Sequence, residues 1–525
     1  DILLPHYEDR SDTESLLFLY ICAGFSYMAL SRTGEPTSRD KTIYFYTKVL
    51  SYRDQIEFFE SAASRDYIFI AYYNLIRVAP GLGILDIETA YRLWEELCQI
   101  RTMPKFCQYD TTNPRIPQLC DRAINDFRAY GAVLNVERVI APSAILSSLE
   151  NMTQIYYSEI LHEHGSIYEC PVFTVFNYHY VQARNGTITW EAAWQILDDY
   201  YVHKMQTIGQ VSSPDLLAFY TNLPLNLIDV LGHTHFKEEF KQATYRRYRN
   251  LITSYLMNQP ASLNSYTLNN GVQLVAFHPL ILGTFQNRME KMNFIVDLVV
   301  TRHLTTFTHS VMVSYLAEAI GKHILAARPE LLRIPSSYLE GNVYASPAEV
   351  LDYIVPAALF HDIGKNGMIP IINTQHRKLN DYEFNIIQTH PQKGSDYLSS
   401  DPDFLIYQPV ALGHHRSYDG TRGYPLSFDN TASPYRDAID LIHICDCLDA
   451  ATDYLSRNYH RAKPFDVVLN ELKAGRGTEY NPDMVDVILS DRELYNDLKM
   501  LTEQNRENIY YDIYLTFVNL RKKRQ

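Results

Sequence analysis

Histidine and aspartate recur on the apolar faces of the helices predicted in the second half of the chain. Eight of the 18 His residues lie between His309 and His443, and several stand beside carboxylates. His309 falls inside an apolar stripe of helical spacing, and Asp446 shares a helix face with Ile439 and Ile442. A buried carboxylate without a partner costs several kcal/mol. Such helices can pack around one interior only if these side chains share a ligand, and a metal cluster is a ligand of that kind.

Two capping-box patterns predict where helices begin in this region, at Ser346 and at Asn380. The first helix leads into the string LFHDIGK (359–365), and the second leads toward His390 on its apolar side. A pair of adjacent histidines follows at 414–415. Any one of these histidines alone is more often a core residue than a metal ligand. Taken together, they favour metal binding.

The first 270 or so residues predict a series of amphipathic helices. Apolar residues recur with helical spacing over Thr13–Leu30, Thr42–Val78, Ile87–Ile100, Ser143–His162, Trp190–Thr207 and Phe236–Met257. The polar, turn-rich segment Asn258–Gly271 is the predicted junction. We therefore expect an all-helical N-terminal domain over residues 1–270, sensory or dimerising, and a second domain over residues 271–525.

Charge and composition exclude several classes of protein. The formal net charge of −14 argues against a clamp on duplex nucleic acid or an anionic membrane. The apolar stretch Leu16–Leu30 is shorter than the ~20 residues of a membrane-spanning helix, so we expect a buried helix and no membrane span. The seven Cys residues form no CxxC pair, which favours a reducing, cytoplasmic location.

Four motifs in the second half resemble those of a known family. They are HDIGK (361–365), TH followed by Pro (389–391), HHRSYDGTRGYP (414–425) and DCLDA (446–450). In order and approximate spacing they resemble the HD-GYP phosphodiesterases, which hydrolyse cyclic dinucleotides, chiefly cyclic di-GMP, in bacteria. The resemblance covers about residues 293–488. It implies a mostly all-α protein whose second domain is a helical, metal-dependent hydrolase.

The resemblance also implies a ligand set for two divalent metal ions, iron or manganese. One ion would take His309, His361, Asp362 and Asp446, and the other Asp362, His390, His414 and His415. Two ions about 3.5–4 Å apart can deprotonate a bridging water, and the hydroxide can attack a phosphorus atom. Imidazole and carboxylate ligands without thiolate favour manganese or iron over structural zinc.

The residues expected to contact substrate are less regular. Asp362 and Lys365 are the residues expected to be catalytic. Lys365 lies one helical step beyond Asp362, so its ammonium is expected to offset phosphate charge next to the metals. Gly423, Tyr424 and Pro425 would form a loop over the substrate. Other expected phosphate contacts are Arg416, which stands where the family usually has Glu, and Arg457 and Arg461, whose spacing from Asp446 is unusual. Family members with a third metal carry Glu where this chain has Thr305.

The predicted function is metal-dependent hydrolysis of a cyclic dinucleotide, most simply cyclic di-GMP to linear pGpG, by a bacterial cytoplasmic enzyme. An alternative is a catalytically weak receptor for a cyclic dinucleotide, or a protein-interaction module on the same fold. A third reading, a hydrolase of other nucleotides, is disfavoured because such chemistry does not require the HH and GYP motifs. Homodimerisation is left open.

Overall fold

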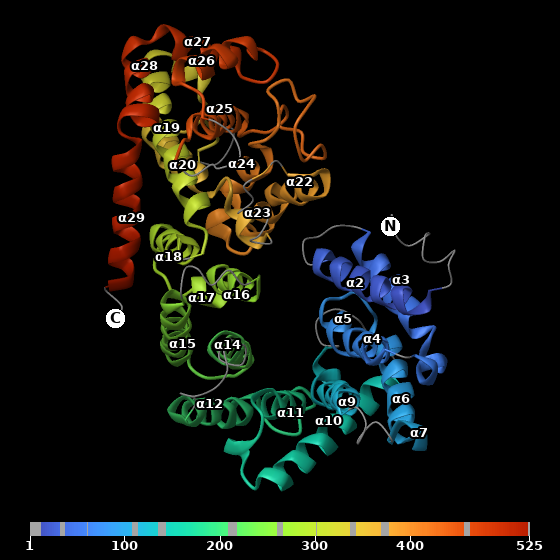
Figure 1. The fold of residues 1–525 in the computed structure, drawn as a ribbon. Helices are drawn as coiled ribbons and strands as arrows, with labels where there is room; N and C mark the ends of the chain where they lie inside the picture. The colour runs from blue at the N-terminus through green and yellow to red at the C-terminus, as the bar shows by residue number, and fades with distance from the viewer. Residues whose placement is uncertain are drawn as a thin grey trace. The chain divides into compact units, whose positions relative to one another are not determined.

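The computed structural model describes residues 12–31, 37–59, 61–107, 114–134, 143–207, 218–259, 266–300, 302–336, 343–368, 377, 379–455 and 462–522. Most of these residues lie in helices (Figure 1). Within these ranges the β-structure consists of isolated bridges, such as Arg416 with Gly423. The predicted all-α class is therefore confirmed. The chain divides into two compact units, Asp1–Lys241 and Gln242–Gln525.

The first unit is a succession of helices with its own apolar core. Its elements are α2 (Thr13–Ser31), α3 (Ser38–Leu50), η1 (Arg53–Phe58), α4 (Ala62–Tyr73), η2 (Asn74–Val78), α5 (Ala79–Gly81), α6 (Ile87–Thr102), α7 (Pro104–Cys107), α9 (Arg115–Leu134), α10 (Ser143–His164), η3 (Ile167–Glu169), α11 (Val172–Arg184), α12 (Trp190–Thr207), η4 (Ala218–Asn222) and α14 (Leu223–Gly232). The single helix predicted over Thr42–Val78 is wrong. The chain leaves the helix after Leu50, and Ser61 starts a new one by accepting a hydrogen bond from the amide of Ser64.

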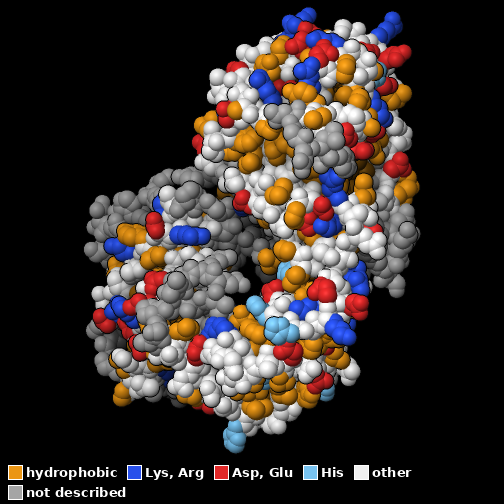
Figure 2. Space-filling view, turned by 180° about the vertical axis from the view of Figure 1, so that it is seen from behind, with side chains coloured by type: hydrophobic (Ala, Val, Ile, Leu, Met, Phe, Trp, Pro, Cys, Tyr) orange, Lys and Arg blue, Asp and Glu red, His pale blue; other side chains and the backbone are white. Residues whose placement is uncertain are grey.

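Helix α2 contains the apolar stretch for which a buried helix is predicted. One face is buried through Leu17 and Tyr20, whereas Phe18 and Phe25 on the other face are 51% and 48% exposed. By length and composition α2 is able to cross a membrane, but a core helix of a soluble protein meets the same criterion. On the face seen in Figure 2, basic and acidic side chains are interspersed and do not form one basic patch.

The second unit begins within α15 (Glu238–Asn258). Its further elements are α16 (Tyr266–Ala276), α17 (Pro279–Leu282), α18 (Arg288–Val300), α19 (Leu304–Ala327), η5 (Pro329–Leu331), α20 (Pro347–Phe360), η6 (Ile363–Gly367), α22 (Asp381–Ile387), α23 (His390–Leu398), η7 (Pro402–Tyr407), α24 (Gln408–Gly413), α25 (Arg436–Thr452), α26 (Phe465–Ala474), α27 (Pro482–Ser490), α28 (Arg492–Lys499), η8 (Met500–Gln504) and α29 (Arg506–Lys522). The unit boundary precedes the predicted junction Asn258–Gly271, part of which lies outside the described residues. Helix α19 packs against both α20 and α25.

Both predicted helix starts are confirmed. The side chains of Ser346 and Asn380 accept hydrogen bonds from the backbone amides of Glu349 and Glu383. In return, the carboxylate of each glutamate accepts a hydrogen bond from the backbone amide of its capping residue. Helix α20 continues through Pro356 and ends directly before His361. The cap at Ser346 therefore fixes the start of α20, and His361 and Asp362 directly follow its last residue.

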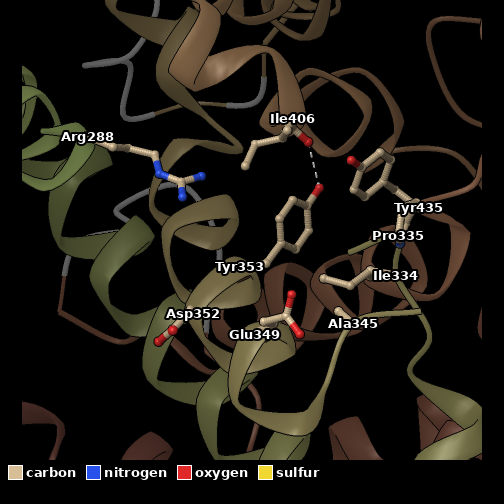
Figure 3. Close-up of a pocket in the computed structure, with 9 residues that line it drawn as sticks. All are labelled: Arg288, Ile334, Pro335, Ala345, Glu349, Asp352, Tyr353, Ile406 and Tyr435. Atoms are coloured by element: carbon tan, nitrogen blue, oxygen red, sulfur yellow. Dashed lines mark hydrogen bonds between the residues drawn. The ribbon is translucent and has the colours of Figure 1, made fainter. Parts of the chain in front are cut away.

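Tyr353 fixes the middle of α20 (Figure 3). Its hydroxyl donates to the carbonyl of Ile406 over 2.8 Å, and its ring stacks on those of Tyr407 and Tyr435. The cavity beside Tyr353 measures only about 20 Å³, which is room for a single water. This packing holds α20 in place, and with it the functional residues that follow its last turn.

Glycine at 364 allows the segment after α20 to approach α23. A Cβ at this position would lie 2.0 Å from the carbonyl oxygen of His390 and 2.6 Å from the amide nitrogen of Gly394. Both are backbone atoms, so neither can move aside cheaply. The glycine of the HDIGK motif thus permits the contact that brings Asp362 to His390.

Candidate metal centre

Five helices of the second unit bring seven histidine and aspartate side chains into one group. The metal-ligand cluster consists of His309 on α19, His361 and Asp362 after α20, His390 at the start of α23, His414 and His415 after α24, and Asp446 on α25. Six of them are buried, and the side chain of His415 is 22% exposed. These are the seven residues for which the sequence predicts metal binding. Residues 137 positions apart in the chain, His309 and Asp446, come within 3.0 Å.

Asp362 lies at the centre of the cluster. Its Oδ1 atom is 3.1 Å from Nε2 of His390 and 3.6 Å from Nε2 of His414. Its Oδ2 atom is 3.5 Å from Nε2 of His361 and 3.6 Å from Nε2 of His309. The two oxygens thus face different sets of histidines, which is the arrangement that a carboxylate bridging two ions requires.

Donor atoms in the cluster form three overlapping groups within 4.8 Å of one another. They are Asp362, His390, His414 and His415; His309, His361 and Asp362; and His361, His414 and Asp446. The first group matches one predicted ligand set in full. The other two groups together contain all four residues of the second predicted set, and they also include His414.

Backbone contacts determine which nitrogen of three histidines carries the proton. The Nδ1 atoms of His361, His390 and His414 lie 2.6, 2.7 and 3.0 Å from the carbonyl oxygens of Ala358, Ile387 and Ala411. A carbonyl can only accept, so Nδ1 donates and, in the neutral ring, Nε2 has a free lone pair. Burial lowers the pKa of His361 to about 3 and that of His390 to about 4, so both rings are neutral at pH 7.

These lone pairs face the Asp362 carboxylate, so acceptor faces acceptor. Asp362 is ionised: burial opposes this, but the positive charge of Lys365 holds the pKa of Asp362 well below its usual range. Nε2 of His361 and Oδ1 of Asp362 are buried without a hydrogen-bond donor. Such an arrangement is repulsive unless cations lie between the groups. The donor set therefore fits divalent metal ions.

His309 differs because carboxylates lie on both sides of its ring. Nε2 is 3.0 Å from Oδ1 of Asp446, and Nδ1 is 2.6 Å from Oδ2 of Asp449. Burial alone would lower the pKa of His309, but these two hydrogen bonds raise it to about 9. An ion that binds Nε2 must displace that proton, while Asp449 can keep its bond to Nδ1. Asp449 therefore supports His309 on the Nδ1 side of its ring.

Thermal stability of the metal-free protein should fall by several degrees between about pH 7 and about pH 9.5. The folded state holds the His309 proton more tightly than the unfolded chain, whose pKa is near 6.5. The resulting stability is full below pH 6.5 and is lost as the pH rises through about 9. Calorimetric melts across this range test the expectation. In His309→Gln this part of the slope should disappear, and an unchanged slope would assign it to other groups.

Lys365 lies against the centre of the cluster. Its Nζ atom is 2.5 Å from Oδ2 of Asp362, and its side chain is 20% exposed. The ammonium is thus paired with the central carboxylate, and the lysine side chain keeps partial access to solvent.

The GYP loop covers the partly exposed side of the cluster. The ring of Tyr424 lies 4.5 Å from that of His415 and 6.1 Å from that of His390, measured between centroids. Gly423 has φ +86°, and a Cβ there would lie 1.9 Å from the carbonyl oxygen of His415. Only glycine fits at that point. The loop is thus tied to the second histidine of the HH pair.

Arg416 has a structural role in this loop. It is 5% exposed, and its guanidinium donates to the carbonyl oxygens of Gly420 and Gly423. The sequence predicts a phosphate contact for Arg416, but a side chain buried among loop carbonyls does not face an incoming phosphate. Arg416 instead holds the GYP loop in shape.

The remaining sequence-predicted residues either do not belong to the metal-ligand cluster or lie outside the described residues. Thr305 is exposed on α19, one turn before His309. Arg457 and Arg461 lie outside the described residues. His443 donates through Nδ1 to the carbonyl of His414 over 2.6 Å and so supports the HH pair.

Sequence reasoning missed Arg506, which is fully buried and lies 2.7 Å from Oδ1 of Asp449. It stands 57 residues after its partner. Nothing in the surrounding sequence distinguishes it from the arginines of a solvated helix, so no signal in a single sequence could have found it.

Comparison with known proteins agrees with this geometry. Residues 306–458 match the HD domain family. A cyclic di-GMP phosphodiesterase of Vibrio cholerae serotype O1 is 26% identical over 303 residues, which are 52% of this chain and 60% of that protein. The cyclic di-GMP phosphodiesterase response regulator RpfG of Xanthomonas campestris is 33% identical over 146 residues, or 27% and 37% of the two chains.

A relative with a different printed substrate is also similar. The 3'3'-cGAMP-specific phosphodiesterase 2 of Vibrio cholerae is 25% identical over 203 residues, which are 38% of this chain and 37% of that protein. The chain thus covers less than two thirds of the length of each of these relatives.

Proposed function

We propose that the chain hydrolyses a cyclic dinucleotide in a metal-dependent reaction. The match of residues 306–458 to the HD domain family and the similarity to proteins named cyclic di-GMP phosphodiesterases support this proposal. Cyclic di-GMP, cut to linear pGpG, is the first candidate. The observation that carries the proposal is the placement of Asp362, whose two oxygens face different histidine groups while Lys365 pairs with one of them and keeps partial access to solvent.

Two divalent ions, iron or manganese, would occupy the metal-ligand cluster. His390, His414 and His415 would hold one ion and His309, His361 and Asp446 the other, with Asp362 shared between them. When bound, such ions supply an activated water and neutralise charge on the scissile phosphate. The absence of thiolate among the donors supports iron or manganese over structural zinc.

The chain's own residues would orient the substrate and exclude water. Lys365 would place its ammonium against a non-bridging phosphate oxygen, where negative charge grows during the attack. Tyr424, packed over His415, would cover the site and reduce its contact with bulk water. The carbonyls of Ala358, Ile387 and Ala411 keep Nδ1 protonated on three histidines, so their Nε2 atoms stay directed inward.

Product chromatography tests the substrate assignment. The protein, purified without oxygen and with its metal content measured, is incubated separately with cyclic di-GMP and 3'3'-cGAMP. We expect cyclic di-GMP to be cut to pGpG. Preferred cleavage of 3'3'-cGAMP would revise the substrate, and turnover of neither compound by metal-loaded protein would refute the function.

Thr305→Glu should raise the metal content above two ions per chain and speed conversion of linear product to mononucleotide. A carboxylate one turn before His309 has both the charge and the reach to bind a third ion, whereas Thr has neither. Metal analysis and product time courses measure the two effects, with Thr305→Gln as the uncharged control of equal length. Three tightly held metals in the unmodified protein, or early mononucleotide as its main product, would contradict this view.

We also propose a cytoplasmic location and a sensory or dimerising role for the first unit. The described cysteines are free thiols, which supports a reducing compartment. The separate apolar core of the first unit supports an independently folded module. A weak-receptor function is not favoured, because all seven predicted metal ligands come together in the metal-ligand cluster and the unusual Arg416 serves the GYP loop.

A further inference from the structure

The C-terminal helix α29 begins with an arginine in the interior of the second unit. Arg506 is 0% exposed, and it lies beyond the residues that match the HD domain family. It directly follows Asn505, after the π-helix η8 (Met500–Gln504). π-Helical turns are rare and are frequent at functional sites. The position is therefore unusual both for its burial and for the backbone that leads to it.

Hydrogen bonds fix the guanidinium of Arg506 on several sides. Nε donates to the carbonyl of Thr502 over 3.0 Å, and Nη2 donates to Oγ1 of Thr452 over 2.8 Å. Nη1 donates to Oδ1 of Asp449 over 2.7 Å and lies 3.3 Å from the Tyr510 hydroxyl. A planar fork with five N–H groups can satisfy these directions at once, and a lysine ammonium cannot.

Asp449 links this arginine to the metal-ligand cluster. It is 0% exposed, and its two oxygens have different partners: Oδ1 accepts from Arg506 and Oδ2 accepts from Nδ1 of His309 over 2.6 Å. The carboxylate is therefore held from one side while it orients the imidazole on the other. The chain of contacts runs from α29 through α25 to α19. Apolar packing of Ile509 and Ile513 against Val311 and Met312 accompanies it, and Figure 1 shows α29 beside α19.

We propose that Arg506 is a positioning residue, which holds Asp449 so that His309 keeps its proton on Nδ1 and directs Nε2 at the metal. This inference rests on the proposed metal-dependent function. Without the arginine, the buried Asp449 carboxylate loses the guanidinium that fixes its Oδ1 atom and is free to rotate, so His309 loses its fixed orientation. Coupling between two sites is reciprocal in binding free energy. Metal binding should therefore stabilise the docking of α29.

Metal affinity, rather than turnover, tests the proposal. It is measured in Arg506→Met, in Arg506→Lys and in a matched control variant. The control is Lys291→Met, because Lys291 on α18 is a partly buried cation of this unit that pairs with two carboxylates, Asp401 and Asp403. Metal-stripped full-length proteins are titrated with Mn²⁺. We expect Arg506→Met to weaken Mn²⁺ binding by about 10–100-fold, as loss of a residue supporting a metal ligand typically does. Arg506→Lys should recover part of the loss, and Lys291→Met should bind as the unmodified protein does.

Hydrogen exchange of the unmodified protein gives a second readout that survives misfolding of any variant. Amides in α29 should become better protected when Mn²⁺ is added. Equal Mn²⁺ affinity in Arg506→Met and the unmodified protein would overturn the proposal, as would an equal loss in Lys291→Met or unchanged protection of α29. Failure of the unmodified protein to bind Mn²⁺ would instead refute the metal site itself, so the two failures are distinguishable.

Discussion

Asp362→Ala should abolish hydrolysis and lower the metal content by more than one equivalent per chain. Its two carboxylate oxygens lie within 3.6 Å of Nε2 atoms from two histidine groups, so one substitution removes a ligand from both ions. The substitution also removes the carboxylate oxygen that lies 2.5 Å from Nζ of Lys365. The ammonium then adds an unpaired positive charge where the metal ions would bind. Metal analysis after anaerobic purification, together with a turnover assay, measures both effects.

His390→Ala is the matched control for that experiment. His390 lies 3.1 Å from Oδ1 of Asp362 and belongs to only one of the three donor groups. It should therefore empty mainly one site and retain part of the second. Normal turnover by Asp362→Ala, or equal metal loss in the two variants, would show that Asp362 does not bridge two ions.

Lys365→Met should lower kcat by about 10²-fold with a smaller change in KM, because the charge acts mainly as the transition state forms. Metal content should stay near that of the unmodified protein, since Lys365 offers no donor atom to a bound ion. Steady-state kinetics on the metal-loaded protein give the two constants separately.

Lys393→Met provides a nearby control for the loss of a lysine. Lys393 on α23 donates to the carbonyl of Gly367, in the same turn that carries Lys365, but its contact is with backbone rather than with Asp362. Its kcat should be close to that of the unmodified protein. A rise in KM alone for Lys365→Met would mean that the ammonium contributes to substrate binding and not to the chemical step.

Much of the fold and of the candidate site could be predicted because the signals are local. The capping residues Ser346 and Asn380 fix helix starts through bonds three residues away, and a single sequence contains that information. The residues of each adjacent pair, 361–362 and 414–415, restrict each other's position, because both residues of a pair directly follow the same helix end. Apolar spacing then indicates that His309 and Asp446 face inward.

The rest depends on contacts between distant segments. Arg506 is recognisable only from its bond to Asp449, 57 residues earlier. Charge alone predicts an anion contact for Arg416, whereas the fold surrounds its guanidinium with the carbonyls of Gly420 and Gly423. The break between α3 and α4 was missed because apolar spacing continues across it, and the cap at Ser61 outweighs that spacing.

Reconstitution of metal-stripped protein with Mn²⁺ or Fe²⁺, without oxygen, tests the central claim most directly. Hydrolysis of cyclic di-GMP is followed as the ion is added in measured steps. The account predicts no turnover in the stripped protein and full turnover when about two ions are bound per chain, one for each histidine group that faces Asp362. Full turnover by protein shown to be free of metal would contradict it.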